Sequence, residues 1–488
     1  MARINTNVPS LIAQHNLQRT NSDLQVRLQR LSTGLRINRG ADGPADLIVS
    51  ERLRSEIEGI GQAIDNAERA TNVIATGEAA LAEVSNLLTS IKSLTVEAAN
   101  EGGLSREEIE ANQLQIDDAV ASISRIASTT SFAGLKLLNG SLDYVTSGVP
   151  TSAISDISVH SANFGTAQTM PVSVEVVTAA EKAALFLSTG AADIPESVTL
   201  EIAGNQGVEV FQFVSSTNLS MVAFAINRMT DSTGVMAQIT SGAGGAGSAL
   251  QFISSEFGTD SFVSVRKLPG SAGGSFLTLY DELAPTGNAV QRDSGEDVLA
   301  LVNGNLALGK GTHVALNSSG LNVDLQLTDA FAQTPGTKEF TITGGGANFQ
   351  LGPVVETSQQ VSFGIHSVLA HHLGNSADGF LSSIASGGDN SLVNGKAREA
   401  SQIIERAITQ VSVARGRLGA FERNTLQTNI RSLQIALENV TSSESQIRDA
   451  DFAAETSALT RAQLLSNVGT TVLATANNNA ANVLSLLQ

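Results

Sequence analysis

Apolar residues recur at alternating steps of three and four along two long stretches of the chain. The first stretch begins at Ile57 and continues, through a second seam, to Ala98. Such an apolar stripe has the heptad-like period of a helix that packs along other helices. A helix from about residue 57 to about residue 98 would be roughly 60 Å long at about 1.5 Å per residue. Because a compact domain cannot bury a helix of that length, it needs partner helices alongside.

A second stripe of the same period runs from Ile404 to Val440, and a shorter one runs from Ile109 to Ile123. We therefore expect two long helices and one shorter helix in a bundle built from both ends of the chain. The prolines agree with this division, because seven of the nine lie between residues 150 and 353, outside these stripes. The stripes alone fit an ordinary intracellular helical bundle equally well.

Between the helical stretches, over roughly residues 146–394, the pattern changes to a period of two. Alternating apolar and polar residues are typical of strands with one buried face. Clusters of Gly, Ser, Thr and Asn separate these runs, and residues 221–229 predict a short helix. The fold class is therefore α+β, with one or two β-rich domains inserted in a long α-helical coiled-coil bundle. The clearest predicted strands are 172–177, 198–202, 208–213 and 321–327.

The two ends of the chain, 1–45 and 452–488, are amphipathic, but neither has a neighbouring segment to cover its apolar face. Ordering a residue costs roughly 1 to 2 kcal/mol, whereas burying a leucine returns about 1.5 to 3 kcal/mol. An Asn-rich run from Asn477 adds weak helix formers. We expect both ends to be loose in a monomer and to fold when neighbouring molecules supply the missing surface. The alternative is that the two ends pair only with each other.

The leucines and valines of these ends are the residues that we expect at an assembly interface. They are Leu17, Leu24, Leu28, Leu31, Leu35, Leu459, Leu464, Val468, Leu473, Leu484 and Leu487.

Composition narrows the classes of function. The formal net charge of −18 over 488 residues repels nucleic acid and anionic membranes, so we expect neither as a partner. The absence of cysteine excludes disulfides, thiolate catalysis and Cys-based metal sites. No apolar stretch approaches the roughly 18 to 20 residues of a spanning helix, so we expect no membrane insertion. The start of the chain lacks the apolar run of a secretory signal, so we expect any export to follow another route.

Three motifs suggest ligand chemistry, and each lacks a necessary part. Residues 242–247 satisfy G-x-G-x-x-G, but the residues that follow predict a strand where a dinucleotide site needs a helix. Residues 304–310 approach a P-loop, but Gly311 stands in the place of the Mg²⁺-binding Ser or Thr. His366, His371 and His372 are not spaced to share one helix face, and no adjacent carboxylate completes a metal site. We therefore expect no cofactor, no metal ion and no catalytic residues.

Sequence blocks at both ends of the chain match one family. The N-terminal blocks are 3–7, 31–38, 41–45 and 128–140, and the C-terminal blocks are 417–421, 444–453 and 482–487. Occurring in this order, over residues 1–140 and about 395–488, they resemble bacterial flagellin, the subunit of the flagellar filament. The middle of the chain resembles flagellin only weakly, in a small module at 225–235.

The resemblance implies a non-enzymatic structural protein that is exported unfolded and polymerises outside the cell into the helical filament used for swimming. Segments 1–45 and 452–488 would form the coiled-coil filament core, 46–145 and 395–451 the surrounding helix bundle, and 146–394 the outer β-rich domains. The implied partners are copies of the chain itself, a flagellar export chaperone, and the hook-associated junction and cap proteins. Two alternatives remain: a hook–filament junction protein, and an adhesin that uses the β-rich middle.

The resemblance also bears on innate immunity. Flagellins sensed by the animal Toll-like receptor carry an Arg, a Leu and a Glu at positions that match Ser90, Leu94 and Gln115, and only Leu94 agrees. Each hydrogen bond to a charged group contributes about 1.5 to 3 kcal/mol. We therefore expect weak or absent recognition by the receptor.

Overall fold

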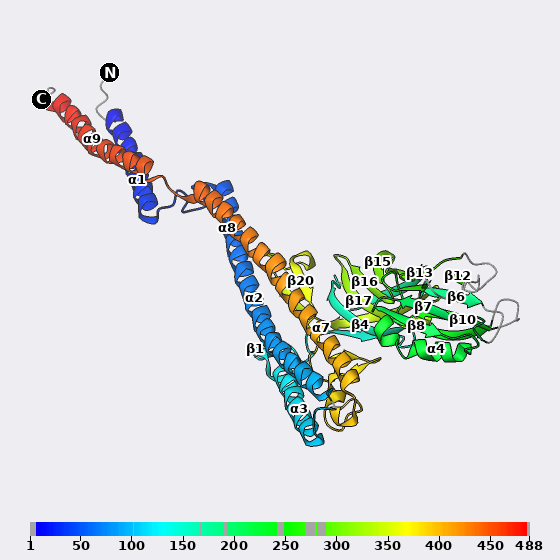
Figure 1. The fold of residues 1–488 in the computed structure, drawn as a ribbon. Coiled ribbons are helices and arrows are strands. Elements are labelled where there is room, and N and C mark those ends of the chain that lie inside the picture. The colour runs from blue at the N-terminus through cyan, green and yellow to red at the C-terminus, as the bar shows by residue number, and fades with distance from the viewer. Residues whose placement is uncertain are drawn as a thin grey trace. The chain divides into compact units, whose positions relative to one another are not determined.

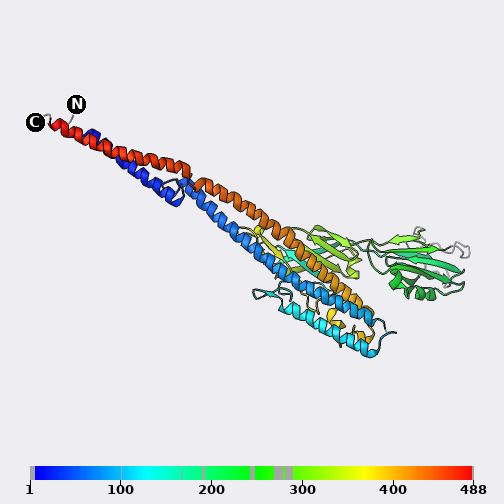
Figure 2. The ribbon, with the colours of Figure 1, turned by 60° about the vertical axis from the view of Figure 1, so that its left-hand side comes forward.

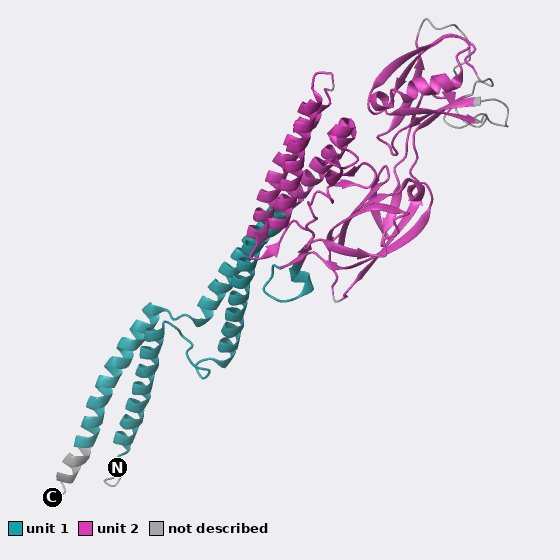
Figure 3. Cartoon of the chain, turned by 90° about the horizontal axis from the view of Figure 1, so that it is seen from below, with its two compact units in different colours: residues 1–71, 350–360, 421–488 teal, residues 72–349, 361–420 magenta. Residues whose placement is uncertain are grey.

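The computed structural model describes residues 6–100, 102–165, 167–188, 193–241, 248–268, 279–280 and 289–485. The chain forms two compact units, coloured separately in Figure 3. The first unit holds residues 1–71, 350–360 and 421–488, and the second holds residues 72–349 and 361–420.

Helices from both ends of the chain build the first unit. Helix α1 (Val8–Thr33) begins at an Asn7 cap, whose side chain accepts a hydrogen bond from the Ser10 amide, and ends at Gly34 with φ of 72°. It lies beside helix α9 (Phe452–Ser485), as Figures 1 and 2 show. Both ends are therefore helical and paired in the single chain, where the sequence predicted loose segments. The Asn-rich run from Asn477 lies within α9.

Helix α2 (Pro44–Ala98) starts earlier than the predicted position near Ile57. Proline fits the first helical position, because that residue's N–H would have no partner within the helix. The first turns carry Ile48 and Val49 in exposed positions, at 64% and 45%, so the buried stripe on which the prediction depended begins only later. The hydrophobic pattern located the buried part of the helix and missed its exposed beginning.

The two long helices and one shorter helix are confirmed. Helix α3 (Arg106–Thr129) begins with a capping box between Ser105 and Glu108, in which each side chain bonds the other's backbone N–H. Helix α7 (Ala397–Phe421) continues through a π-helical turn (Glu422–Leu426) into α8 (Gln427–Arg448). Within the second unit many residues of the predicted stripes are buried, among them Ile74, Val84, Ile91, Ile116, Ile123, Ile404, Ala407, Val411 and Leu418.

The first β-rich domain is an eight-stranded antiparallel sheet with the order β3-β18-β5-β14-β15-β16-β17-β4. One face of the sheet buries an apolar core that includes Val174, Val323 and Phe340. The strands are β3 (Tyr144–Ser147), β4 (Ile154–Ala162), β5 (Met170–Thr178), β14 (Leu299–Val302), β15 (Asn305–Lys310), β16 (His313–Asn317), β17 (Leu321–Leu327) and β18 (Gly336–Gly345).

The second β-rich domain has a separate core, which includes Leu200, Leu250 and Phe252. Two four-stranded sheets enclose it, with the orders β12-β6-β10-β9 and β13-β11-β7-β8. All four clearest predicted strands are present in the two domains, and the predicted short helix is α4. The elements are β6 (Ala184–Ser188), β7 (Val198–Ala203), β8 (Val208–Phe213), α4 (Leu219–Asn227), α5 (Thr230–Thr233), β9 (Val235–Ser241), β10 (Ser248–Ser254), β11 (Phe262–Lys267), β12 (Leu279–Tyr280) and β13 (Arg292–Ser294).

Short elements complete the described chain. They are β1 (Ser131–Phe132), β2 (Leu135–Lys136), α6 (Asp329–Ala332), β19 (Ala347–Gln350), β20 (Gln360–Phe363), β21 (Gly374–Asn375), β22 (Gly379–Phe380) and the 3-10 turns Thr357–Gln359, Leu381–Ile384 and Leu392–Asn394. Among the helices of the described residues, none has the length and apolar character needed to span a membrane.

Candidate assembly surface

Helices α1 and α9 form an antiparallel pair with an apolar seam. Ala13 and Ala462 are buried in the pair, at 7% and 2% exposure. Leu17 lies against Gly469, where an added Cβ would come within 3.1 Å of Leu17 Cδ1. The absence of a side chain at Gly469 therefore lets the two helices approach closely. Six of the predicted interface residues are half-buried: Leu17, Leu24, Leu31, Leu35, Leu459 and Leu473.

Polar contacts fix the register of the pair near the chain ends. Asn7 Nδ2 donates to the Ala476 carbonyl at 3.0 Å, and Ser10 Oγ bonds Asn477 Oδ1 at 2.7 Å. The Asn-rich run, which predicted a weak helix, thus supplies polar partners for α1.

A buried carboxylate holds the other end of the pair. Glu455 is only 6% exposed, and its two oxygens accept hydrogen bonds from Arg27 Nη1 at 2.9 Å and from Arg30 Nη1 at 3.1 Å. Burial by itself would raise the pKa of Glu455, but the hydrogen bonds from Arg27 and Arg30 outweigh it and lower that pKa. Sequence periodicity missed this cluster, because a contact between residues so distant in the chain leaves no local pattern.

An apolar stripe remains exposed on α9. Leu464, Val468 and Val472 recur every four residues and therefore lie along one face of the helix, at 61%, 55% and 49% exposure. We call these three residues the α9 stripe. Other apolar residues of the pair are also exposed, namely Val8, Leu11, Ile12, Leu28, Phe452 and Leu465. Exposed apolar surface on this scale marks a site of interaction with another molecule.

The predicted interface residues are thus divided by the structure. The half-buried residues of α1 and α9 lie where the two helices pair, and Leu35 lies beyond α1 in a bridge to Asp449. Leu28, Leu464 and Val468 are exposed. Leu484 belongs to α9, and Leu487 lies outside the described residues.

The receptor-equivalent positions lie on two helices of the second unit. Ser90 and Leu94 are on α2, where Ser90 is exposed and Leu94 is half-buried. Gln115 is exposed on α3.

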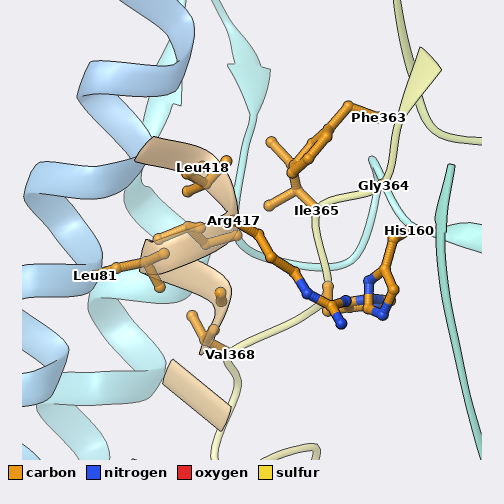
Figure 4. A pocket seen from close by; sticks show the side chains of 11 residues that line it. Leu81, His160, Phe363, Gly364, Ile365, Val368, Arg417 and Leu418 are labelled. Atoms are coloured by element: carbon orange, nitrogen blue, oxygen red, sulfur yellow. The ribbon is translucent and has the colours of Figure 1, made fainter. Parts of the chain in front are cut away.

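A polar cluster that the sequence did not predict lies in the second unit. His160 of β4 faces Asp324 of β17, with Nε2 and Oδ2 3.1 Å apart, and Arg417 of α7 bonds the same oxygen at 2.5 Å. Burial and the nearby Arg417 charge lower the pKa of His160 to about 2. Arg417, His160, Leu81 and Leu418 are among the residues that line a small cavity of about 30 Å³. Figure 4 shows these side chains.

The predicted histidine group is organised differently from the expectation. His366 does have a carboxylate neighbour, because Asp143 Oδ1 lies 2.9 Å from its Nδ1, which corrects the sequence prediction. The exposed rings of His371 and His372 contact each other, with centroids 4.5 Å apart. In the part of the chain that the structure describes, no three His, Asp or Glu side chains are grouped so as to hold a metal ion.

The two glycine motifs have the following positions. Residues 242–247 lie outside the described residues, and the predicted strand after them is β10. Residues 305–310 form β15, which pairs with β16 in a hairpin, so the helix that a P-loop needs does not follow.

Comparisons with known proteins match both ends of the chain. The model of the bacterial flagellin N-terminal helical region matches residues 4–143, and that of the C-terminal helical region matches residues 401–487. The B-type flagellin of Pseudomonas aeruginosa is 30% identical over 508 residues, covering 99% of each chain. The flagellin of Salmonella typhimurium is 27% identical over 510 residues and also covers 99% of each chain. Among solved structures, flagellar hook associated protein-3 of Legionella pneumophila is similar over 81% of this chain and 98% of its own, with 12% identity and a TM-score of 0.31.

Proposed function

Since this chain belongs to the bacterial flagellins and is a structural subunit of the flagellar filament, we propose that subunits join through the exposed apolar surface of the α1–α9 pair. The observation that carries the proposal is the α9 stripe, which stays exposed although α1 and α9 already pair with each other. Burying a leucine or valine side chain returns about 1.5 to 3 kcal/mol, so contacts repeated between many copies favour a polymer. A surface that meets a different surface on the next copy builds an open helix.

The fixed register within each pair supports the same proposal. Arg27 and Arg30 hold Glu455 at one end, and Asn7 bonds Ala476 near the other. A pair fixed in register presents the same stripe in every copy, which a repeating interface requires. The seam residues therefore build the pair, and the exposed residues join the subunits.

The absence of cysteine offers a direct test. A single cysteine introduced as Leu464→Cys would be the chain's only thiol, and we expect a maleimide to label it in the monomer but not in the filament. Asn305→Cys, at an exposed position on β15, is the matched control and should label equally in both states. Equal labelling of Leu464→Cys in monomer and filament would place the interface elsewhere.

We further propose a three-part organisation of the subunit. Segments 1–45 and 452–488 form the filament core, 46–145 and 395–451 the surrounding helix bundle, and 146–394 the outward β-rich domains. Support comes from two separate apolar cores with their own sheets, which lie within 146–394 except for Tyr144 of the first core. Proteolysis of assembled filaments should cut first within 146–394, and cleavage first at α9 would contradict this order.

The remaining partners follow from the same role. We propose that the subunit is secreted through the flagellar export channel and is extracellular. We assign it a flagellar export chaperone and hook-associated junction and cap proteins as partners, and no catalytic activity. Co-purification of the chain with its export chaperone from the cytoplasm tests this assignment.

Recognition by the animal Toll-like receptor is proposed to be weak or absent. Ser90 and Gln115 are exposed and uncharged where sensed flagellins carry an Arg and a Glu. The double variant Ser90→Arg, Gln115→Glu should therefore raise the reporter response to purified monomer. A response of the unmodified chain as strong as that of a highly stimulating flagellin would refute the proposal.

A further inference from the structure

Four side chains of the second unit are linked in a row by three polar contacts, which we call the histidine network. Asp143 lies 2.9 Å from His366 Nδ1, His366 Nε2 lies 3.1 Å from His160 Nδ1, and His160 Nε2 lies 3.1 Å from Asp324. Arg417 bonds Asp324 at the far end. The histidine network therefore connects a segment that follows β20 to strands β4 and β17, and through them to helix α7.

The number of ring N–H protons in the histidine network follows from its hydrogen bonds. Each of the three contacts needs one N–H, because a carboxylate oxygen can only accept. Two neutral imidazoles carry one N–H each, so together they supply two protons for three contacts. Forming all three hydrogen bonds therefore requires a third proton, and with it one positive charge on the histidine pair.

We infer that His160 and His366 hold one extra proton between them and that this proton fastens the segment after β20 to strands β4 and β17. Charge balance supports the inference. Asp143 and Asp324 carry two negative charges, and Arg417 with the histidine pair carries two positive ones. Loss of the proton leaves one unbalanced negative charge in a half-buried cluster, which is costly.

The location of the proton follows from burial. His160 is 8% exposed and lies beside the Arg417 guanidinium, so its neutral form is favoured. Neutral His160 donates from Nε2 to Asp324 and accepts at Nδ1. His366 then carries both of its protons, donating to Asp143 from Nδ1 and to His160 from Nε2. The edge-on arrangement of the two rings, with an interplanar angle of 85°, suits this contact.

Other charged groups around the pair act in both directions. Arg417 and His313 disfavour positive charge on His160, and Asp156 of β4 interacts favourably with a charged His366. Burial raises the pKa of Asp156, which weakens its contribution in acid. The titratable and charged groups around the pair are Asp143 just before β3, Asp156 and His160 of β4, His313 of β16, Asp324 of β17, His366 after β20, and Arg406 and Arg417 of α7.

The structural consequence has a definite sign. When the shared proton leaves, one of the three contacts brings two lone pairs together: the contact between the imidazoles, the one between His160 and Asp324, or the one between His366 and Asp143. The link therefore holds at lower pH and weakens as the pH rises. This inference does not depend on the α1–α9 assembly surface, because all of its residues belong to the second unit.

Hydrogen–deuterium exchange of the full-length monomer tests the link. Peptides that contain β4 and β17 should lose roughly tenfold protection, the scale of one charge-assisted hydrogen bond, as the pH rises between about 5 and 9 after correction for intrinsic exchange. His366→Ala should remove this pH dependence. His371→Ala changes an exposed histidine that is not part of the histidine network. It is the matched control and should keep the pH dependence.

A second variant separates the shared proton from a simple loss of folding. Asp143→Asn keeps an acceptor for His366 but removes a negative charge, so the loss of protection should move to lower pH. Where the link holds, imidazole ¹⁵N shifts should show both ring nitrogens of His366 protonated and only Nε2 of His160 protonated. Protection that does not change with pH in the unmodified chain, or a neutral His366 where the link holds, would overturn the inference.

Discussion

Leu17 Cδ1 lies so near Gly469 that a Cβ at that glycine would approach it within 3.1 Å. The contact places the absence of a side chain on α9 directly opposite a leucine of α1, in the middle of the seam. It also explains why a glycine occurs inside a long helix, where glycine costs about 0.5 to 1 kcal/mol relative to alanine.

Gly469→Val should therefore weaken the α1–α9 pair. Filling a tight contact with extra methyl groups typically costs about 1 to 3 kcal/mol. The measurement is hydrogen exchange in peptides from α1, which should become faster. Gly416→Val is the control, because an added Cβ at Gly416 meets nothing within 4 Å. Equal exchange of the α1 peptides in both variants would show that the contact at Gly469 does not hold the pair.

Glu455→Gln should also release α1. The glutamine cannot satisfy both Arg27 and Arg30 as an anion does, and hydrogen bonds to charged groups contribute about 1.5 to 3 kcal/mol. An energy of that size corresponds to a rise of about tenfold or more in the hydrogen exchange rate of the α1 amides. Glu438→Gln, at an exposed position on α8, should leave α1 unchanged. Unchanged exchange in Glu455→Gln would mean that the cluster does not hold the pair.

Acid should weaken the same pair. The hydrogen bonds from Arg27 and Arg30 lower the pKa of Glu455 in the folded chain against the effect of burial. A carboxyl with a lowered folded pKa contributes stability above the ordinary glutamate pKa of about 4.3 and loses it as the pH falls through the folded value. Protection of α1 should stay constant from about pH 8 to pH 5 and fall in stronger acid. The fall should be absent in Glu455→Gln, and a loss of protection that begins near neutral pH would point to another group.

The β-rich region should be stabilised independently by its own core. Phe252 is completely buried in the second β domain, and phenylalanine-to-alanine changes in cores cost about 3 to 5 kcal/mol. Chemical denaturation followed by far-UV circular dichroism should show this loss for Phe252→Ala. Phe224→Ala removes a ring that is 59% exposed and should cost far less. Filament elongation should be unaffected by Phe252→Ala below its unfolding transition, and a failure to elongate there would assign the second β domain a role in assembly.

Repeating patterns predicted the elements that bury a regular face. The stripes through Ile74 and Val84 located α2 because buried residues recur at the helical period, and the alternation over 321–327 located β17 in the same way. The start of α2 was missed because Ile48 and Val49 are exposed there, so no buried face marks it. The sequence also predicted that both ends of the chain are loose, because neither end can bury its own apolar face. In the structure, each end covers part of the apolar face of the other.

Contacts between distant residues leave no such pattern. Glu455 meets Arg27, and His160 meets His366, only because the fold brings separate elements together. Along the sequence, His366 groups with its neighbours His371 and His372, whereas Asp143 and His160 are distant from it in the chain. Gly469 gave no signal either, since a single glycine in a helical pattern has several explanations.

Seeded filament elongation by a variant of the α9 stripe is the most direct test of the assembly surface. Leu464→Asp places a charge on the exposed stripe, and Gln463→Asp places the same charge at an exposed neighbouring position that is not in the stripe. Electron microscopy of seeds with each purified monomer should show long filaments with Gln463→Asp and no growth with Leu464→Asp, while circular dichroism shows both monomers folded. Normal elongation by Leu464→Asp would contradict the proposal that this surface joins the subunits.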